Sequence, residues 1–503
     1  MASSVPLSTR VVVKLQDVKL KLTCTPELLT KSLADAVIIP FLGAYNTKRG
    51  TNVQVGGLSS VVLDGARVDD VSRAAVDVIG ASESPTVELE LAPEPAAEPD
   101  TPAGQCEAAL NALFALPGDA TTAEQFEPVH KLRELSRDSA KALGVAEKIV
   151  TPRLVMLAAE RACVRTNESA LSGLAMEAAV LLHNLLQIDR EGAGTALCTQ
   201  GGLAKLIGAL DDGEPPVALR RLRYLGQIAF CASLSPAVAP HVGSLSEATR
   251  SAFADVCKDL SSPATSAVDS FFDVAIAAGL ATDLARTLFN LIRLEPPDSS
   301  SLASRALMDS ILTSLCDLLR CSSTEAAVTE AKADSLQLAV VIPKELACPA
   351  LSSEWKPIAG LLLDRLKAAE EDTSESNGPI MPALVLQYLA ESEPALREAI
   401  KCFVIPKEYL DAPIDPDDPY RPAGQARGWD PNDKLPLDAP LRIRMIKALT
   451  SINYNLKRVV GDCLLALFAG DAQEFTRICG LGSAAGVLQE RDLLGSFQHL
   501  SAG

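Results

Sequence analysis

Two hydrophobic periods divide the chain. Within residues 10–24, apolar and charged residues alternate in the run Val18, Lys19, Leu20, Lys21 and Leu22. This two-residue period is typical of a strand with one buried face, and the segment predicts a β-hairpin. From Cys106 to about Gln498, apolar residues recur instead at helical spacing, in segments that Gly, Pro, Ser and Asp interrupt. The pattern therefore predicts a small α+β domain followed by a mainly α region.

A helix follows the predicted hairpin. Thr25 is suited to cap a helix whose first residue is Pro26, because Thr accepts a hydrogen bond from an unpaired N–H and Pro needs no donor partner there. Pro40 should kink or restart this helix, since proline cannot donate to the preceding turn. The buried face of the helix is predicted to carry Leu29, Leu33, Ala36 and Val37.

Two more strands complete the N-terminal domain. They are predicted from Leu58 to Leu63 and around Leu89, with a turn at Asp64-Gly65 after the first, which gives the order ββαββ. This order and the Leu-Asp-Gly-Ala-Arg turn resemble the ubiquitin-like β-grasp fold over residues 8–92. The last strand carries no Gly-Gly, so we expect a docking module rather than a conjugated modifier. The alternative is a β-rich cap on the helical region.

The helical region resembles an armadillo/HEAT-type right-handed solenoid. Residues 93–105 are rich in Pro and Glu and predict an exposed linker. After Gly201-Gly202, which sets a sharp turn, apolar residues occur at i, i+3, i+4 and i+7, namely Leu203, Leu206, Ile207 and Leu210. Such repeats stack and leave a concave groove. We expect the solenoid at 106–479, with an Asp/Pro-rich insertion at 406–440.

Composition excludes several classes of function. The chain has 46 Lys plus Arg against 64 Asp plus Glu, a net charge of -18, so we expect no nucleic-acid partner. It has no run of about 18 uncharged apolar residues, so we expect a cytoplasmic protein without an integral membrane segment. The 12 Cys are scattered singly and there are 4 His, which predicts reduced core thiols, no metal and no cofactor.

The C-terminal stretch contains Lys457-Arg458 on a helix, an aromatic, and a Gly-x-Gly-x-Ala-Ala-Gly run. This combination is similar to the end of the synembryn family, the chaperones and guanine-nucleotide exchange factors of G-protein α subunits. The positions that match are Gly480, Gly482, Ala484, Ala485, Gly486, Leu488, Leu493, Leu494 and Gly495. The resemblance covers roughly residues 106–500. A nucleotide-binding loop is not expected at these glycines, because no strand precedes them and no Lys-Ser/Thr follows.

The resemblance implies where a client would bind. In the family, the client's C-terminal helix lies in the groove, and its carboxylate needs cations opposite it, because Arg forms strong paired hydrogen bonds with carboxylates. The predicted groove residues are Arg161, Arg165, Asn184, Arg223 and Asn290. Each Arg could instead be an ordinary surface charge, and each Asn could bond to its own solenoid. A tail at 480–503 is predicted to contact the client through Gly480, Gly482, Gly486, Leu488, Leu493 and Leu494.

The sequence therefore predicts a monomeric binding protein without its own catalytic site. It would hold a G-protein α subunit, favour its nucleotide-free state and act in signal transduction. The alternative is an armadillo adaptor or a chaperone for another client with a C-terminal helix or apolar tail, such as a protein kinase catalytic subunit. Import adaptors carry Trp-x-x-x-Asn arrays, and Trp355 and Trp429 lie outside such a pattern.

Overall fold

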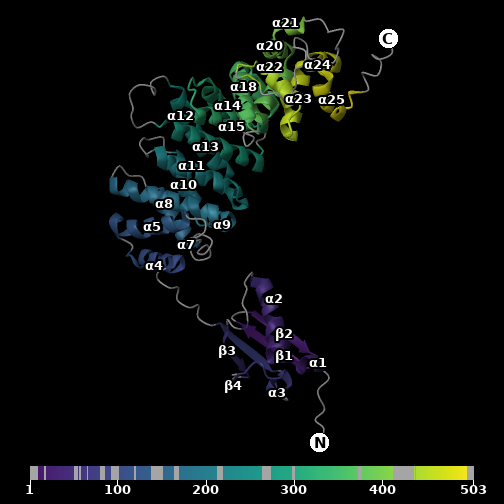
Figure 1. Cartoon of the computed structure of the whole chain (residues 1–503). Helices are drawn as coiled ribbons and strands as arrows, with labels where there is room; N and C mark the ends of the chain where they lie inside the picture. The colour runs from purple at the N-terminus through teal and green to yellow at the C-terminus, as the bar shows by residue number, and fades with distance from the viewer. Residues whose placement is uncertain are drawn as a thin grey trace. The chain divides into compact units, whose positions relative to one another are not determined.

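The computed structural model divides the chain into two compact units, Met1–Glu98 and Pro99–Gly503, each with its own hydrophobic core (Figure 1). We call them the N-terminal unit and the helical unit. The structure describes residues 9–15, 18–49, 55, 58–64, 66–68, 70–79, 85–91, 101–117, 120–137, 151–163, 169–211, 219–262, 273–296, 301–371, 377–411, 435–436 and 438–494.

The N-terminal unit contains a mixed five-stranded sheet in the order β2-β1-β5-β3-β4. Strands β1 and β5 pair in parallel, and the other neighbours are antiparallel. The strands are β1 (Thr9–Leu15), β2 (Val18–Cys24), β3 (Leu58–Leu63), β4 (Ala66–Arg67) and β5 (Thr86–Leu91). The predicted hairpin and the strand from Leu58 to Leu63 are confirmed. The sequence analysis missed β4, a two-residue strand too short for any period to register.

Helical segments pack on one face of this sheet. Thr25 caps the first of them, since its Oγ1 accepts a hydrogen bond from Leu28 N at 3.4 Å, as predicted. Pro40 is the second residue of a new helix, so the predicted restart is also found. The segments are α1 (Pro26–Leu29), the π-helix η1 (Ala34–Ile38), α2 (Ile39–Arg49) and α3 (Ala75–Ile79). The core between sheet and helices includes Val11, Val13, Val37, Phe41 and Leu89.

The helical unit is almost entirely α-helical where it is described, as the composition predicted. Its first helix begins at Pro102 with Thr101 as its cap, so the predicted linker at 93–105 extends too far toward the C-terminus. The N-terminal half contains α4 (Pro102–Ala115), α5 (Thr122–Arg137), α7 (Pro152–Ala162), α8 (Ser169–Ile188), α9 (Arg190–Thr199), α10 (Gly202–Asp211), α11 (Leu219–Ser233), the 3-10 helix η3 (Pro236–His241), α12 (Val242–Ser261) and α13 (Val274–Leu294).

The C-terminal half continues in the same way. It contains α14 (Leu302–Arg320), α15 (Ala326–Ser335), α16 (Gln337–Val341), α17 (Lys344–Leu351), α18 (Trp355–Glu371), α19 (Ile380–Ser392), α20 (Pro394–Val404), α21 (Lys407–Leu410), α22 (Leu441–Ala448), α23 (Tyr454–Leu467), α24 (Ala472–Cys479) and α25 (Leu481–Glu490). Most of the predicted insertion at 406–440 lies outside the described residues.

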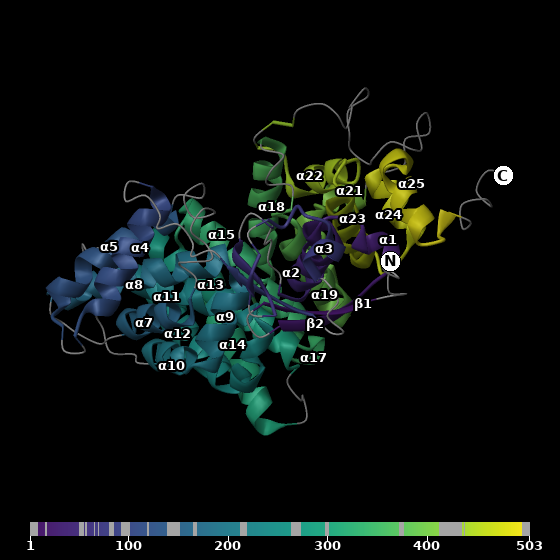
Figure 2. The same cartoon turned by 90° about the horizontal axis from the view of Figure 1, so that it is seen from below.

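Two rows of helices run through the unit (Figures 1 and 2). In the first row, each helix packs against the next in the order α5, α8, α11, α13 and α15. In the second row, the order is α7, α10, α12, α14 and α17. Helices of the two rows also pack against each other, as α7 does on α8 and α12 on α13. This succession is consistent with the predicted solenoid.

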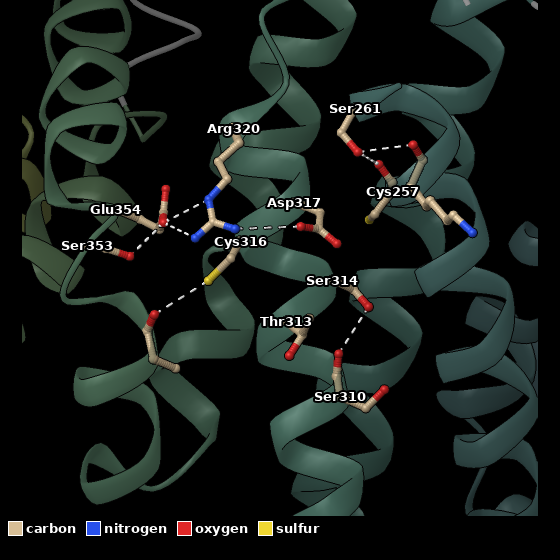
Figure 3. A network of polar contacts seen from close by, with 12 residues as sticks. Cys257, Ser261, Ser310, Thr313, Ser314, Cys316, Asp317, Arg320, Ser353 and Glu354 are labelled. Carbon is tan, nitrogen blue, oxygen red and sulfur yellow. Dashed lines mark hydrogen bonds and ion pairs between the residues drawn. The ribbon is translucent and has the colours of Figure 1, made fainter. Parts of the chain in front are cut away.

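A polar clasp ties the second row to α18 (Figure 3). Arg320, at the end of α14, donates from Nε and Nη2 to Glu354 Oε1, at 3.0 and 2.5 Å. Ser353 Oγ donates to the same oxygen at 2.7 Å. Because Glu354 is buried, Arg320 provides the charge that makes its burial tolerable.

One described helix, α13, is long and apolar enough to cross a membrane by length and composition. However, 67% of its apolar window is buried inside the unit. It lies between α11 and α15 in the first row and also packs on α12. A core helix of a helical array has this same composition.

The separate cores predict independent stability of the two units. Phe41 is fully buried in the N-terminal core, so Phe41→Ala should cost that unit about 3–5 kcal/mol. Hydrogen exchange read by mass spectrometry should then show faster exchange in β1 and β5 and unchanged exchange in α8 to α15. Ile39→Ala, in the same helix but at a side chain 50% exposed, is the control. Faster exchange throughout the helical unit in Phe41→Ala would contradict the division.

Candidate functional site

Three of the predicted groove residues share the first row. Asn184 lies on α8, Arg223 on α11 and Asn290 on α13. Arg161 lies on α7, in the second row, which corrects its assignment to the same surface. The Arg-x-x-x-Arg spacing could not reveal this, because it fixes a face of one helix but not the row that the helix joins. Arg165 lies outside the described residues.

The two asparagines make the same kind of contact on different helices of the first row. Asn184 Nδ2 donates to Ser136 Oγ at 3.0 Å, and Ser136 Oγ donates to Arg133 O at 2.8 Å. Asn290 Nδ2 donates to Ser233 Oγ at 3.0 Å, and Ser233 in turn donates to the carbonyl oxygen three residues earlier. Both serines are buried near the end of the preceding helix of the row. Each amide group therefore binds within its own unit, which was the alternative interpretation.

Arg223, like Arg221 on the same helix, is a first-row cation with a buried Nε atom that lacks a hydrogen-bond partner among the described residues. Its guanidinium lies against Gly279, where a Cβ atom would be 2.7 Å from Arg223 Cζ. Only glycine leaves this space on α13. The Nε atom is buried and has no hydrogen-bond partner among the described residues. A buried donor without an acceptor is costly, so an acceptor supplied by a ligand would relieve this cost.

Asp283 lies next to Arg223 on α13, and the sequence analysis missed it. It is 9% exposed, and its Oδ2 has no hydrogen-bond partner among the described residues. Burial raises its pKa to about 6, although Arg223, Arg286 and a hydrogen bond from Gln227 lower it. The neighbouring Arg286 forms an ion pair with Asp334 of α15 at 2.5 Å. Because Asp283 lies in a long apolar run, the sequence gave no signal of a functional carboxylate at this position.

The N-terminal part of the row is more fully neutralised. Glu177 Oε2 lies 3.0 Å from His130 Nδ1 and 2.9 Å from Arg133 Nε. Phe126 stacks on the His130 ring with centroids 5.8 Å apart. On α11, by contrast, the buried Nε atoms of Arg221 and Arg223 have no hydrogen-bond partner among the described residues. We call the side chains of Asn184, Arg223, Asp283, Arg286 and Asn290 the polar strip.

Arg161 lines a separate cleft of about 590 Å³. Arg153 lies over the ring of Phe114, with its Cζ 4.0 Å from the centroid, and lines the same cleft. Glu160 on the rim pairs with Lys205 at 3.0 Å. The cleft lies among α4, α7 and the segment before α10, and none of the polar-strip residues lines it.

The predicted C-terminal tail is part of the packed unit over its first half. Gly480 ends α24 with φ 77°, a left-handed conformation that favours glycine, and α25 begins directly after it. Leu488 is fully buried, so it is not exposed to a client in this conformation, and the boundary predicted at 480 is wrong for residues 481–490. Leu493 and Leu494 are partly buried against the same core. Residues 495–503 lie outside the described residues.

Close contacts hold α25 on α23. A Cβ at Gly461 would lie 2.5 Å from Val487 Cγ2, and one at Gly486 would lie 2.7 Å from Lys457 Nζ. Gly482, by contrast, has no neighbour within 4 Å of such an atom. Arg491 pairs with Asp462 at 2.5 Å. Of the three predicted glycines, Gly480 thus has a backbone reason, its positive φ, whereas Gly486 lies beside the flexible end of Lys457 and Gly482 has no close neighbour.

No protein-family model matches the chain. No curated protein sequence shows significant similarity to it either. The synembryn resemblance therefore stays a prediction that depends on the residues quoted for it.

Among the residues the structure describes, no group of three His, Cys, Asp or Glu side chains could hold a metal ion. Of the 12 Cys, all free, only Cys163 and Cys402 are not buried. Burial raises the pKa of Cys198 and of Cys316 to about 11, so these thiols stay protonated and weakly nucleophilic at neutral pH.

The raised pKa of Asp283 predicts that Asp283→Asn increases the free energy of unfolding by an amount that depends on pH. The pKa of Asp283 rises from 3.8 to about 6 in the folded state. Between pH 3.8 and about pH 6, Asp283 is therefore protonated in the folded state and ionised in the unfolded state, so its contribution lowers the free energy of unfolding as pH rises. Asp283→Asn should therefore stabilise the helical unit by up to about 3 kcal/mol above pH 6. Urea unfolding should show the difference shrinking toward pH 4. A difference independent of pH would contradict the assignment.

The packing of α25 predicts opposite effects for two glycine substitutions. Gly461→Ala should lower the free energy of unfolding by about 1–3 kcal/mol, because the β-branched Val487 cannot move aside easily. Gly482→Ala is the control, and it should be neutral or stabilising by up to about 1 kcal/mol through helix propensity. Chemical denaturation of both variants checks this. Equal effects would mean that α25 is loosely attached.

Proposed function

We propose that the helical unit is a right-handed armadillo-type solenoid that holds the C-terminal helix of a G-protein α subunit. In this proposal it acts as a chaperone and guanine-nucleotide exchange factor, in the cytoplasm and as a monomer, without a catalytic site of its own. The N-terminal unit would be a ubiquitin-like β-grasp docking module. The observation that carries the proposal is Arg223, a cation of the first row whose buried Nε has no hydrogen-bond partner among the described residues.

The packing supports the proposed folds. Long helices succeed one another in two parallel rows, and each helix packs on its predecessor and its successor, which is the arrangement of stacked repeats. In the N-terminal unit, a hairpin is followed by a helix, and the first and last strands pair in parallel at the centre. That strand order is the one expected of a β-grasp domain.

The polar strip supports the proposed client. A helix that ends in a carboxylate brings negative charge and acceptors, which suit the unpartnered Nε of Arg223. Asp283 and Arg286 are neighbours on the same helix and would favour a ligand that presents both a donor and an acceptor. The Oδ1 atoms of Asn184 and Asn290 would remain for backbone N–H groups, because only their Nδ2 atoms bind the serines.

Exchange would follow from a difference in affinity. A protein that binds the nucleotide-free client more tightly than the loaded client shifts the client toward release of GDP. Holding the client's last helix outside its domain would give such a difference. Because Leu488 belongs to the core, deleting residues 480–503 would damage the unit, and a surface substitution is the cleaner test.

Charge reversal of Arg223 tests the proposal. Arg223→Glu should weaken binding of a labelled Gα C-terminal peptide at least tenfold, since an unpaired charge at such a contact costs about 2–5 kcal/mol. Arg305→Glu, an exposed residue of α14 in the second row, is the matched control and should change affinity little. The same peptide with an amidated C-terminus should lose most of its dependence on Arg223. Fluorescence anisotropy gives the dissociation constants.

Release of labelled GDP from purified Gα separates the two parts of the proposal. Intact protein should accelerate release, and Arg223→Glu should reduce the acceleration more than Arg305→Glu does. Equal peptide affinities for the two variants would remove Arg223 from the site. Peptide binding without any acceleration would leave a chaperone or adaptor and exclude an exchange factor.

A further inference from the structure

Strand β2 is an open edge of the N-terminal sheet. It pairs with β1 along its whole length, from Leu15↔Val18 to Thr9↔Cys24, and it has no neighbour on its other side in the described sheet. Seven residues make it as long as β1. Edges of this length present a row of unpaired backbone donors and acceptors, which is a template for another strand.

The register shows which backbone groups point outward. Val12 N donates to Pro85 O on the β5 side of β1. Because backbone N–H and C=O groups alternate in direction along a strand, those of Val11 and Val13 point toward β2. Val13 pairs with Leu20 and Val11 with Leu22. The N–H and C=O groups of Lys19, Lys21 and Thr23 therefore face away from β1 and are open to a partner.

The same residues make this edge basic. Lys19, Lys21 and Thr23 are exposed, and they alternate with Val18, Leu20 and Leu22 on the core face. Lys14, opposite Lys19 in the register, is paired with Glu88 at 2.8 Å. Within the described residues, no acidic side chain pairs with Lys19 or Lys21. Lys19 and Lys21, at i and i+2, thus lie without an acidic partner among the described residues, on the exposed face of an edge strand. The chain as a whole has a net charge of -18.

We propose that β2 binds an acidic extended segment of another protein by strand addition. The segment extends the sheet beyond β2, and its alternate carboxylates face Lys19 and Lys21, as oppositely charged pairs do across neighbouring strands. A second copy of this chain is a poor occupant, because antiparallel pairing of two β2 strands about Leu20 would set Lys19 opposite Lys21. This site is separate from the polar strip and independent of its client.

Strand addition and charge select the partner at two levels. Backbone hydrogen bonds require an extended segment with free N–H groups, whereas the lysines reject basic or uncharged strands. Because Lys19 and Lys21 lie on the face away from the core, substituting them leaves the N-terminal core unchanged. They are therefore suitable positions for a test with the full-length protein.

The test uses a labelled seven-residue peptide in which Glu alternates with Val, capped at both ends, and anisotropy at low ionic strength. Lys19→Glu with Lys21→Glu should weaken binding at least tenfold, about 1.4 kcal/mol. Lys31→Glu with Arg73→Glu, an exposed pair near the bridge Ser32↔Ala74 on the helical side of the unit, is the charge-matched control. The corresponding Lys-Val peptide should prefer the doubly reversed variant.

Backbone pairing is tested separately from charge. A Glu-Val peptide N-methylated at alternate residues cannot donate to the edge and should lose binding. Thr23→Pro removes an outward N–H without removing a charge or a bond to β1, and it should weaken binding of the unmethylated peptide. Equal binding of the methylated and unmethylated peptides would mean that only charge attraction, without backbone pairing, holds the peptide, and this result would overturn the proposal. So would equal losses in the two charge-reversed variants, or no binding of the Glu-Val peptide to the intact protein.

Discussion

The helical unit depends on burying one face of every helix against its neighbours in the row. Alanines and leucines of α8, α11 and α13 are buried almost without exception, and close packing of such faces supplies most of the stability of a helical array. An inner helix such as α13 has neighbours on several sides, so only a narrow strip of its surface remains partly exposed. Whatever the unit recognises through this row must be read by the few side chains on that strip.

Polar groups on the strip are held by the same packing. Asn184 and Asn290 bond to buried serines at the end of the preceding helix, which ties neighbouring helices of the first row together. Arg223 needs the missing side chain of Gly279 to lie flat on α13. Asp283 is covered by α11, where a Cβ atom added at Gly226 would lie 3.7 Å from Asp283 Cβ. Positioning of the candidate ligand groups is therefore a consequence of helix packing rather than of loops.

Local features were predictable from the sequence, and long-range ones were not. The hairpin, the Thr25 cap, the restart at Pro40 and the strand from Leu58 to Leu63 depend on short-range periodicity and capping chemistry, and all are present. The row to which Arg161 belongs and the burial of Leu488 depend on contacts between distant helices. Asp283 and the serine partners had no signal at all, because a single polar residue within an apolar helix is defined by what covers it.

The C-terminal helix shows how this limit affects function. A run of glycines and small residues resembles a family tail, yet the structure gives Gly480 a backbone reason, its positive φ, that holds without any client. Gly482 has no such reason, since no atom lies within 4 Å of its added Cβ. The positive φ at Gly480 favours glycine without any client, whereas the flexible end of Lys457 beside Gly486 and the open space beside Gly482 require no glycine, so the run does not by itself indicate a bound partner.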